Sequence, residues 1–267
     1  MFQTDEYIKL SRKILQVAPV VRIFLLGTRL VKYSTESIFS PESLIDESTD
    51  HYYLLVLIKR THEASYKSLH EKIETTCHSI CPVTAIILEF EQFNQWLQEG
   101  HDFAYQVRTK STLLFEDLSV SFGDVKEVAP DTINASKHAT RSKGLNLMQE
   151  FLIGADLYRI RKQNKMAAFM LHQAAEFALH AILKISTGLC VNSHNLDKLI
   201  RYCSIANSNV SKVFNRRIEN ENRLFQLLQR AYIETRYKET YSINNSDLLE
   251  ITHKIGLLHE ILVALKC

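Results

Sequence analysis

Ionisable side chains form a regular series within the most apolar part of the chain. His172, Glu176, His180 and Lys184 follow one another at steps of four within residues 165–187, where almost every other position is apolar. Residues four apart lie on one face of an α-helix, so the spacing predicts a polar line along a buried helix. Buried polar groups cost free energy unless they are paired, so some of these side chains must meet partners from other segments.

Candidate partners lie beside this series and downstream of it. The resulting set of candidate ligand-binding residues is His172, Gln173, Glu176, His194, Tyr232, Arg236 and Tyr237. One interpretation is a structural network, for instance an Arg236–Glu176 pair that fixes the register of two helices. The other is a pocket for a nucleotide or an RNA end, in which Arg236 and Lys238 bind phosphate and a tyrosine stacks on a base. Both interpretations stay open on the sequence alone.

A second group of potential ligands lies in the first half of the chain. Cys77 and Cys81 are one helical turn apart with His78 between them, a spacing that could contribute to a zinc site. Zinc needs further ligands, and no second Cys/His cluster follows. We therefore expect ordinary free thiols here, with no bound metal and no cofactor.

Composition sets limits on the class of protein. The chain has 267 residues and 46% hydrophobic content, enough for two domains with real cores. With 32 basic and 30 acidic residues, no strong overall charge favours nucleic acid or membranes, and no DNA-binding motif is visible. Asp5 and Glu6 stand where a secretory signal carries positive charge, and no apolar run suggests a membrane span. We expect a cytoplasmic protein.

The first 117 residues predict an α/β domain with a mixed sheet. Short apolar runs predict strands, and helical spacing predicts helices between them. The expected elements are a helix at 3–17, strands at 20–26, 52–58 and 83–88, a short helix at 91–97 and an edge strand at 113–115. Residues 31–50 are a polar mixture with a proline, and we expect an irregular insertion there.

The segments FLLGTR and YYLLVLI resemble the first two strands of minimal nucleotidyltransferase domains. Gly27 and Thr28 match the small-residue pair that follows the family's first strand. The two metal-binding aspartates of the family fall on His51 and Tyr53, which are not hard oxygen ligands for magnesium, and Asp50 is one residue out of register. The resemblance therefore implies a degenerate transferase site, a retained fold and no catalysis.

The remainder predicts a linker followed by a helical bundle. Residues 118–143 lack periodicity and are mainly polar, so we expect a linker there. Residues 144–267 are expected to form an all-α five-helix bundle. The predicted helices cover 145–161, 165–187, 195–205, 218–238 and 246–264.

This second domain resembles HEPN domains, specifically those fused behind a nucleotidyltransferase domain. The likeness is carried by AAFMLHQAAE at 167–176, by HNL at 194–196 and by AYIETRY at 231–237. The resemblance implies dimerisation through the helices, so we expect a homodimer.

Active HEPN ribonucleases pair an arginine with a histidine four to six residues later, and no arginine of this chain has such a partner. After Arg236 the corresponding positions hold Thr240, Tyr241 and Ser242. We therefore expect a non-catalytic nucleotide- or RNA-binding protein, with a toxin–antitoxin or defence-type system as its expected setting. The alternatives are a divergent ribonuclease that uses Arg236 and Tyr241, and a dimeric protein-interaction scaffold. A tyrosine is a poor proton shuttle near neutral pH, which weighs against the ribonuclease.

Overall fold

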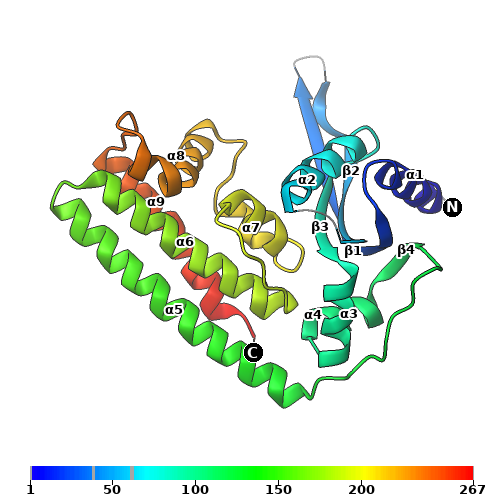
Figure 1. Ribbon diagram of the computed structural model, residues 1–267. Helices are drawn as coiled ribbons and strands as arrows, with labels where there is room; N and C mark the ends of the chain where they lie inside the picture. Colours follow the sequence, from blue (N-terminus) through cyan, green and yellow to red (C-terminus); the bar gives the residue numbers. More distant parts are fainter. Residues whose placement is uncertain (1, 38–39, 61–62, 267) are drawn as a thin grey trace. The chain divides into compact units, whose positions relative to one another are not determined.

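The computed structural model describes residues 2–37, 40–60 and 63–266 of the chain. The chain divides into two compact units, one of residues 1–128 and one of residues 129–267 (Figure 1). The first is an α/β domain and the second is helical, as the sequence predicts.

A four-stranded mixed sheet forms the centre of the N-terminal domain. Its strands are β1 (Val20–Ser37), β2 (Ser40–Ile58), β3 (Val83–Glu89) and β4 (Thr112–Glu116), in the order β3-β2-β1-β4. β1 pairs antiparallel with β2 and β4, whereas β2 pairs parallel with β3. Residues 52–58 of β2 are buried throughout, as expected of a central strand covered on both faces.

Helices and an aromatic cluster cover the two faces of this sheet. The helices are α1 (Phe2–Leu15), α2 (Glu63–Cys77), α3 (Phe90–Glu99) and α4 (Asp102–Lys110). Apolar residues of α1 and α2 pack in one core cluster with Ile23 of β1. The next residue, Phe24, points to the opposite face, because side chains alternate along a strand. There it contacts Phe93 of α3 and Phe122 at ring-centroid distances of 6.3 and 6.4 Å.

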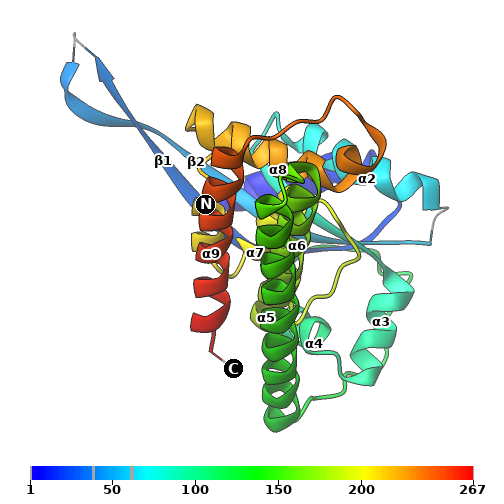
Figure 2. The same ribbon diagram turned by 90° about the vertical axis from the view of Figure 1, so that its left-hand side faces the viewer.

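The expected irregular insertion at 31–50 is wrong, because most of it lies in strands. β1 and β2 continue as an antiparallel pair well beyond the part that β3 and β4 cover, as Figure 2 shows. Val31, Tyr33 and Thr35 alternate with polar residues, which is the period of a strand. The polar composition concealed this period, and residues 38–39 lie outside the described part of the chain.

The expected linker at 118–143 is also wrong as a description of the local structure. Residues up to 128 belong to the N-terminal unit. Arg22, buried in β1, pairs with Glu116 at 2.9 Å and donates hydrogen bonds to the backbone carbonyls of Asp117, at 2.6 Å, and Val120. These bonds hold the segment after β4 against the sheet, and the polar composition of residues 118–128 gives no sign of this contact.

Within the described part of the C-terminal unit there are five α-helices and one short 3-10 helix, η1 (Ser208–Lys212). The α-helices are α5 (Pro130–Ile160), α6 (Asn164–Thr187), α7 (Leu196–Cys203), α8 (Glu219–Tyr237) and α9 (Asn245–Ala264). α6 packs against each of the other four, which explains why it is apolar almost all round.

α6 is also the one helix in the described residues with the length and composition of a membrane span. Its most apolar window is 67% buried inside the bundle, as is usual for the core helix of a soluble domain. This corrects the expectation that no segment approaches such a composition. The length and composition of this one helix are weak evidence for a membrane span.

α5 begins well before the predicted start of the bundle, at Pro130. Most residues from 130 to 143 are exposed, so no apolar face marks the helical period there. Pro130 at the first turn and Asp131 after it are favourable at a helix N-terminus. Further along, a Cβ on Gly144 would lie 2.6 Å from the Cβ of Ala181, so glycine permits the close approach of α5 and α6.

Candidate functional site

A buried carboxylate lies at the centre of the candidate site. Glu176 is on the inward face of α6, is 6% exposed, and accepts hydrogen bonds from Nδ1 of His194 at 2.9 Å and from Nε2 of Gln173 at 3.3 Å. His172 lies one turn earlier on α6, with Nδ1 3.6 Å from the carboxylate. Asn195 caps α7 by accepting a hydrogen bond from the amide of Lys198 at 3.0 Å, and this cap fixes the backbone just after His194.

Helix α8 contributes an aromatic ring that closes over this group. The Tyr232 ring stacks on the His194 imidazole, with centroids 4.4 Å apart and planes inclined by 16°. Its centroid is 5.2 Å from that of His172 and 6.3 Å from that of Phe169. Tyr232 therefore links the polar residues of α6 to the segment before α7.

Arg236 lies one turn after Tyr232 and is exposed. Its Nε donates a hydrogen bond to the carbonyl of Tyr232 at 2.9 Å. The guanidinium carbon lies 4.5 Å from the centroid of the Tyr232 ring, 5.3 Å from that of Tyr237 and 5.6 Å from that of Phe169. No carboxylate among the described residues forms an ion pair with Arg236. The guanidinium is therefore held in place by rings and one carbonyl, and no described carboxylate neutralises its positive charge.

The inner and outer ends of the cluster differ in charge. Burial lowers the pKa of His172 to about 4, and positive charge on Arg236 adds to the effect. His172 is therefore neutral near pH 7 and cannot act as a cation there. At the outer end, His194 is half-exposed and Tyr237 is 75% exposed.

All seven predicted ligand-binding residues meet in this one region, but three details differ from expectation. Glu176 is bound by His194 and not by Arg236. The ammonium group of Lys238 lies 2.7 Å from a carboxylate oxygen of Glu234, so it is not free for phosphate. The missed member is Phe169, which precedes His172 by three residues and so lies on the same face of a helix.

Tyr241 does not join the cluster. It is buried, and its hydroxyl donates a hydrogen bond to the carbonyl of Leu227 at 3.1 Å. Burial also raises the pKa of Tyr241 above its usual value. Tyr241 is therefore a structural residue and a poor proton shuttle.

The four positions predicted for a degenerate transferase site come together on β1 and β2. Gly27 pairs with Tyr53 across the strands, and Thr28 with Tyr52, while the rings of His51 and Tyr53 are 4.9 Å apart. Nε2 of His51 is 2.9 Å from the hydroxyl of Thr84 on β3. Thr84 is not among the residues predicted from the sequence, because a single hydroxyl on a buried strand has no pattern of its own. In the described part of the chain no group of three potential metal ligands converges.

The cysteine pair is buried in the N-terminal core. Neither Cys77 nor Cys81 forms a disulfide with a described residue, and burial raises the pKa of Cys77 to about 11. A thiol with so high a pKa stays protonated and is a poor metal ligand at neutral pH.

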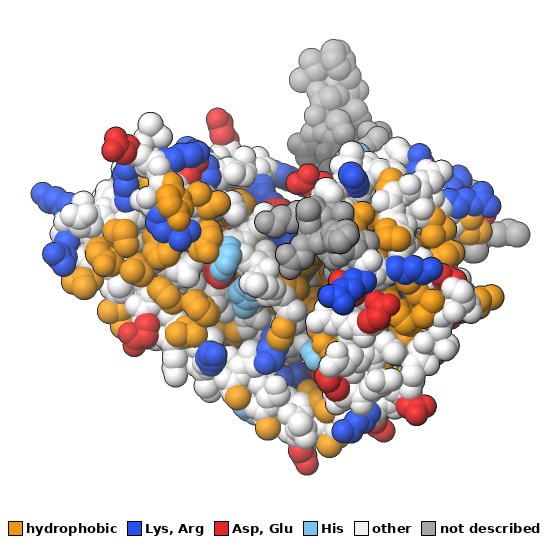
Figure 3. All heavy atoms as spheres, viewed as in Figure 1, with side chains coloured by type: hydrophobic (Ala, Val, Ile, Leu, Met, Phe, Trp, Pro, Cys, Tyr) orange, Lys and Arg blue, Asp and Glu red, His pale blue; other side chains and the backbone are white. Residues whose placement is uncertain are grey.

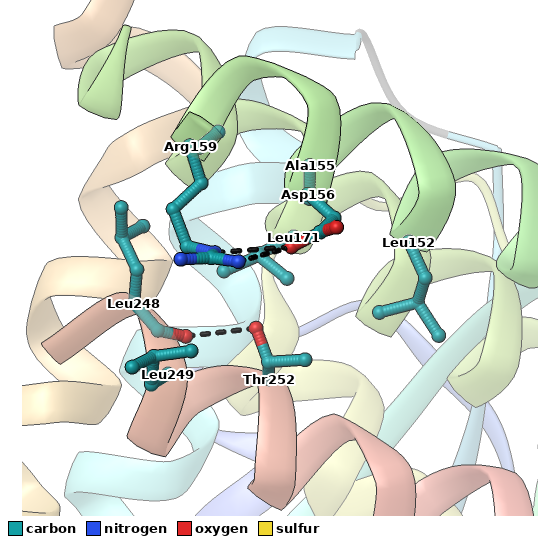
Figure 4. Close-up of a pocket in the computed structure, with 9 residues that line it drawn as sticks. Leu152, Ala155, Asp156, Arg159, Leu171, Leu248, Leu249 and Thr252 are labelled. Carbon is teal, nitrogen blue, oxygen red and sulfur yellow. Dashed lines mark hydrogen bonds and ion pairs between the residues drawn. The ribbon is translucent and has the colours of Figure 1, made fainter. Parts of the chain in front are cut away.

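A small cavity between α5, α6 and α9 is separate from the candidate site (Figure 4). Arg159 extends across it and bonds Asp156 on its own helix and Asn245 at the start of α9. The cavity has a volume of about 40 Å³, which leaves room for water but not for a nucleotide.

The surface view shows histidine side chains beside hydrophobic and basic ones on the C-terminal domain (Figure 3). The C-terminal domain is thus a helical bundle with a polar, partly open cluster between α6, the start of α7 and the end of α8.

Comparison with known families gives this bundle its class. The HEPN domain family matches residues 149–265, somewhat less than half of the chain. A HEPN domain is therefore present in the C-terminal half, as the sequence predicts. Comparison with the curated proteins gave no match.

Proposed function

We propose that this protein binds a nucleotide or single-stranded RNA, without cleaving it, at a surface formed by His194, Tyr232, Arg236 and Tyr237. The observation that carries the proposal is the guanidinium of Arg236, which is held over aromatic rings at an exposed position without a described carboxylate partner. We call these four residues the α8 surface.

The α8 surface has the chemistry of a phosphate and base site. Because Nε of Arg236 is bound to a backbone carbonyl, the two terminal nitrogens stay available for the paired oxygens of a phosphate. Tyr232 is already stacked on His194, so it orients its neighbours. The exposed rings of Tyr237 and His194 are those on which a base could stack.

The absence of cleavage rests on the groups around Arg236. RNA cleavage without a metal needs a proton acceptor beside the phosphate. Tyr241, the residue at the motif position, is buried and bound to Leu227. The divergent ribonuclease that uses Arg236 and Tyr241 is therefore the weaker alternative. Intact RNA after prolonged incubation with the pure protein would agree with this, and cleavage products that Arg236→Ala abolishes would overturn it.

The binding test is a titration of a fluorescent single-stranded RNA followed by anisotropy, repeated with nucleoside mono-, di- and triphosphates. A hydrogen-bonded charge contributes about 1.5–3 kcal/mol, so Arg236→Ala should weaken binding about tenfold or more. It should also lower the slope of log affinity against log salt by about 0.7 for each phosphate that the variant no longer neutralises.

Arg230→Ala is the matched control, because Arg230 is on the same helix, is similarly exposed and is paired with Glu234 at 3.5 Å. Equal effects of the two substitutions would mean that RNA is attracted by positive charge in general and is not bound by the α8 surface in particular. No binding by the wild-type protein at any concentration below millimolar would remove the proposal.

A homodimeric scaffold is the second candidate function. Ile153, Leu157 and Ile160 lie at helical spacing on α5 and are 57%, 54% and 65% exposed. An apolar stripe of this kind supports association with a second copy of the chain. Leu157→Glu should convert a dimer to a monomer in sedimentation experiments. A wild-type protein that is monomeric at all concentrations would exclude this candidate.

We also propose that the N-terminal domain is an inactive nucleotidyltransferase fold. The mixed sheet and the meeting of Gly27, Thr28, His51 and Tyr53 support this assignment. Calorimetric titration with magnesium ATP should give no magnesium-dependent binding to this domain. Such binding would contradict inactivity.

A cytoplasmic location and a role in a toxin–antitoxin or defence-type system rest on the sequence expectations. Cell fractionation tests the location. Growth arrest on expression, relieved by a neighbouring gene, would support the role, and unaffected growth would count against it.

A further inference from the structure

A groove between α5 and α6, separate from the α8 surface, has no counter-charge for the cations that line it. Its volume is about 230 Å³. The lining residues are Thr140, Lys143, Gly144, Leu147, Phe177, His180, Ala181, Lys184 and Cys190. Two are lysines and none is an aspartate or glutamate.

The floor of the groove is apolar. Leu147, Phe177 and Ala181 form it, and the Phe177 ring is stacked on that of Phe151 with centroids 5.4 Å apart. At Gly144 the two helices approach so closely that a Cβ would collide with Ala181. The groove therefore belongs to the α5–α6 packing, since its floor is made by residues of the two helices.

Positive charge at the rim comes from the lysines alone. His180 is hydrogen-bonded through Nε2 to the carbonyl of Ser193 at 3.0 Å, and burial lowers its pKa, so it is neutral near pH 7. Neither Lys143 nor Lys184 has an ion pair with any described residue. Two cations without a counter-charge beside an apolar floor attract an anion that has an apolar body.

We propose that this groove binds a small organic anion, with an aromatic or aliphatic body on Leu147 and Phe177 and a phosphate or carboxylate between Lys143 and Lys184. The volume admits a ring with one anionic group, and lysine binds phosphate as a compact charge. The site is independent of the α8 surface, because the two share no residue and the groove uses none of α8.

Cys190 provides a direct readout, because it lines the groove and is exposed, whereas Cys77, Cys81 and Cys203 are buried. The test measures the rate at which iodoacetamide alkylates Cys190 in the full chain, by mass spectrometry of the peptide that contains it. Phenyl phosphate and benzoate are the two anionic probes. Benzyl alcohol keeps the ring without the charge, and inorganic phosphate keeps the charge without the ring.

We expect phenyl phosphate, benzoate or both to slow alkylation saturably, to about a tenth of the free rate at ten times the dissociation constant. The probe that protects Cys190 shows whether the groove prefers a phosphate or a carboxylate. The double substitution Lys143→Met and Lys184→Met should abolish protection, whereas Lys137→Met, at a partly exposed lysine of α5 outside the groove, should leave it intact. Circular dichroism checks that each variant is folded.

Three results would overturn the proposal. They are no protection by either anionic probe at millimolar concentration, equal protection by benzyl alcohol, and equal protection by inorganic phosphate. The second would indicate a purely apolar groove, and the third a surface charge effect. Loss of RNA binding in Arg236→Ala bears on the α8 surface alone.

Discussion

The two domains each contain a cluster of polar residues, and the clusters differ in the charge that they keep. In the N-terminal domain, Nε2 of His51 is 2.9 Å from the hydroxyl of Thr84, and the His51 ring is tilted by 47° to that of Tyr53, so these groups are used in packing. In the C-terminal domain, a buried carboxylate holds a histidine, and an arginine at the edge has no described carboxylate partner. The two clusters therefore differ as candidate ligand sites, because an arginine without a described carboxylate partner lies only beside the C-terminal one.

The two clusters should also differ in how much stability is lost when one of their hydrogen bonds is removed. A buried carboxylate is tolerated only while its hydrogen bonds are made, because desolvation of a charge costs several kcal/mol. A buried hydroxyl that loses its partner costs far less. The C-terminal cluster should therefore be the more sensitive of the two to substitution.

The largest expected effect follows from Glu176→Ala. This change removes the carboxylate that binds His194 and Gln173, and breaking a buried charged network costs on the order of 3 kcal/mol. Urea unfolding followed by circular dichroism measures the loss. Glu150→Ala, at an exposed position of α5, is the control and should change stability by about 0.5 kcal/mol or less. Equal effects of the two would mean that the Glu176 network contributes nothing to stability.

Acid sensitivity should also be concentrated in the C-terminal cluster. The pKa of His172 falls from 6.5 to about 4 on folding, so between these values the unfolded chain binds more protons than the folded one. The contribution of neutral His172 to the free energy of unfolding is fully present above pH 6.5 and decreases as the pH falls to 4. The total decrease is no more than about 3 kcal/mol.

His172→Asn should remove this part of the pH dependence without removing that of the carboxylates. The measurement is the free energy of unfolding of both proteins across pH 4–7. Parallel curves would show that His172 is not desolvated as its burial implies.

A smaller effect is expected in the N-terminal cluster. Thr84→Val keeps the volume and removes one hydrogen bond to His51, which costs about 1 kcal/mol or less. His51 is partly exposed and can bond water in its place. Unfolding in urea, compared with Glu176→Ala, measures the contrast between the domains. A loss of stability as large as that of Glu176→Ala would contradict the expectation that the N-terminal cluster is the less sensitive of the two.

How much was predictable from sequence differs in the same way between the regions. The steps of four on α6 located His172 and Glu176, because burial in a bundle makes polar exceptions visible. The partner of Glu176 could not be derived, because whether His194 or Arg236 reaches it depends on how the helices pack. Thr84 was missed because a hydroxyl on a buried strand has no pattern of its own. The start of α5 was missed because an exposed helix shows no apolar period.

The smallest expected effect separates stability from binding within the C-terminal domain. Lys162, in the turn between α5 and α6, has a left-handed backbone with φ +62°. This conformation costs a residue with a side chain about 1–2 kcal/mol, and glycine avoids that cost while adding about 0.4–1 kcal/mol of unfolded-state entropy. Lys162→Gly should therefore raise stability by roughly 0.5 kcal/mol.

The same substitution at Lys137, inside helix α5, should lower stability by about 1 kcal/mol, because glycine is unfavourable in a helix. Thermal unfolding compares the two variants. Since neither residue belongs to the α8 surface, RNA affinity should be unchanged in both. A change in affinity that followed stability would mean that Arg236→Ala also acts through the fold, and the contrast between a packed cluster and a binding cluster would then disappear.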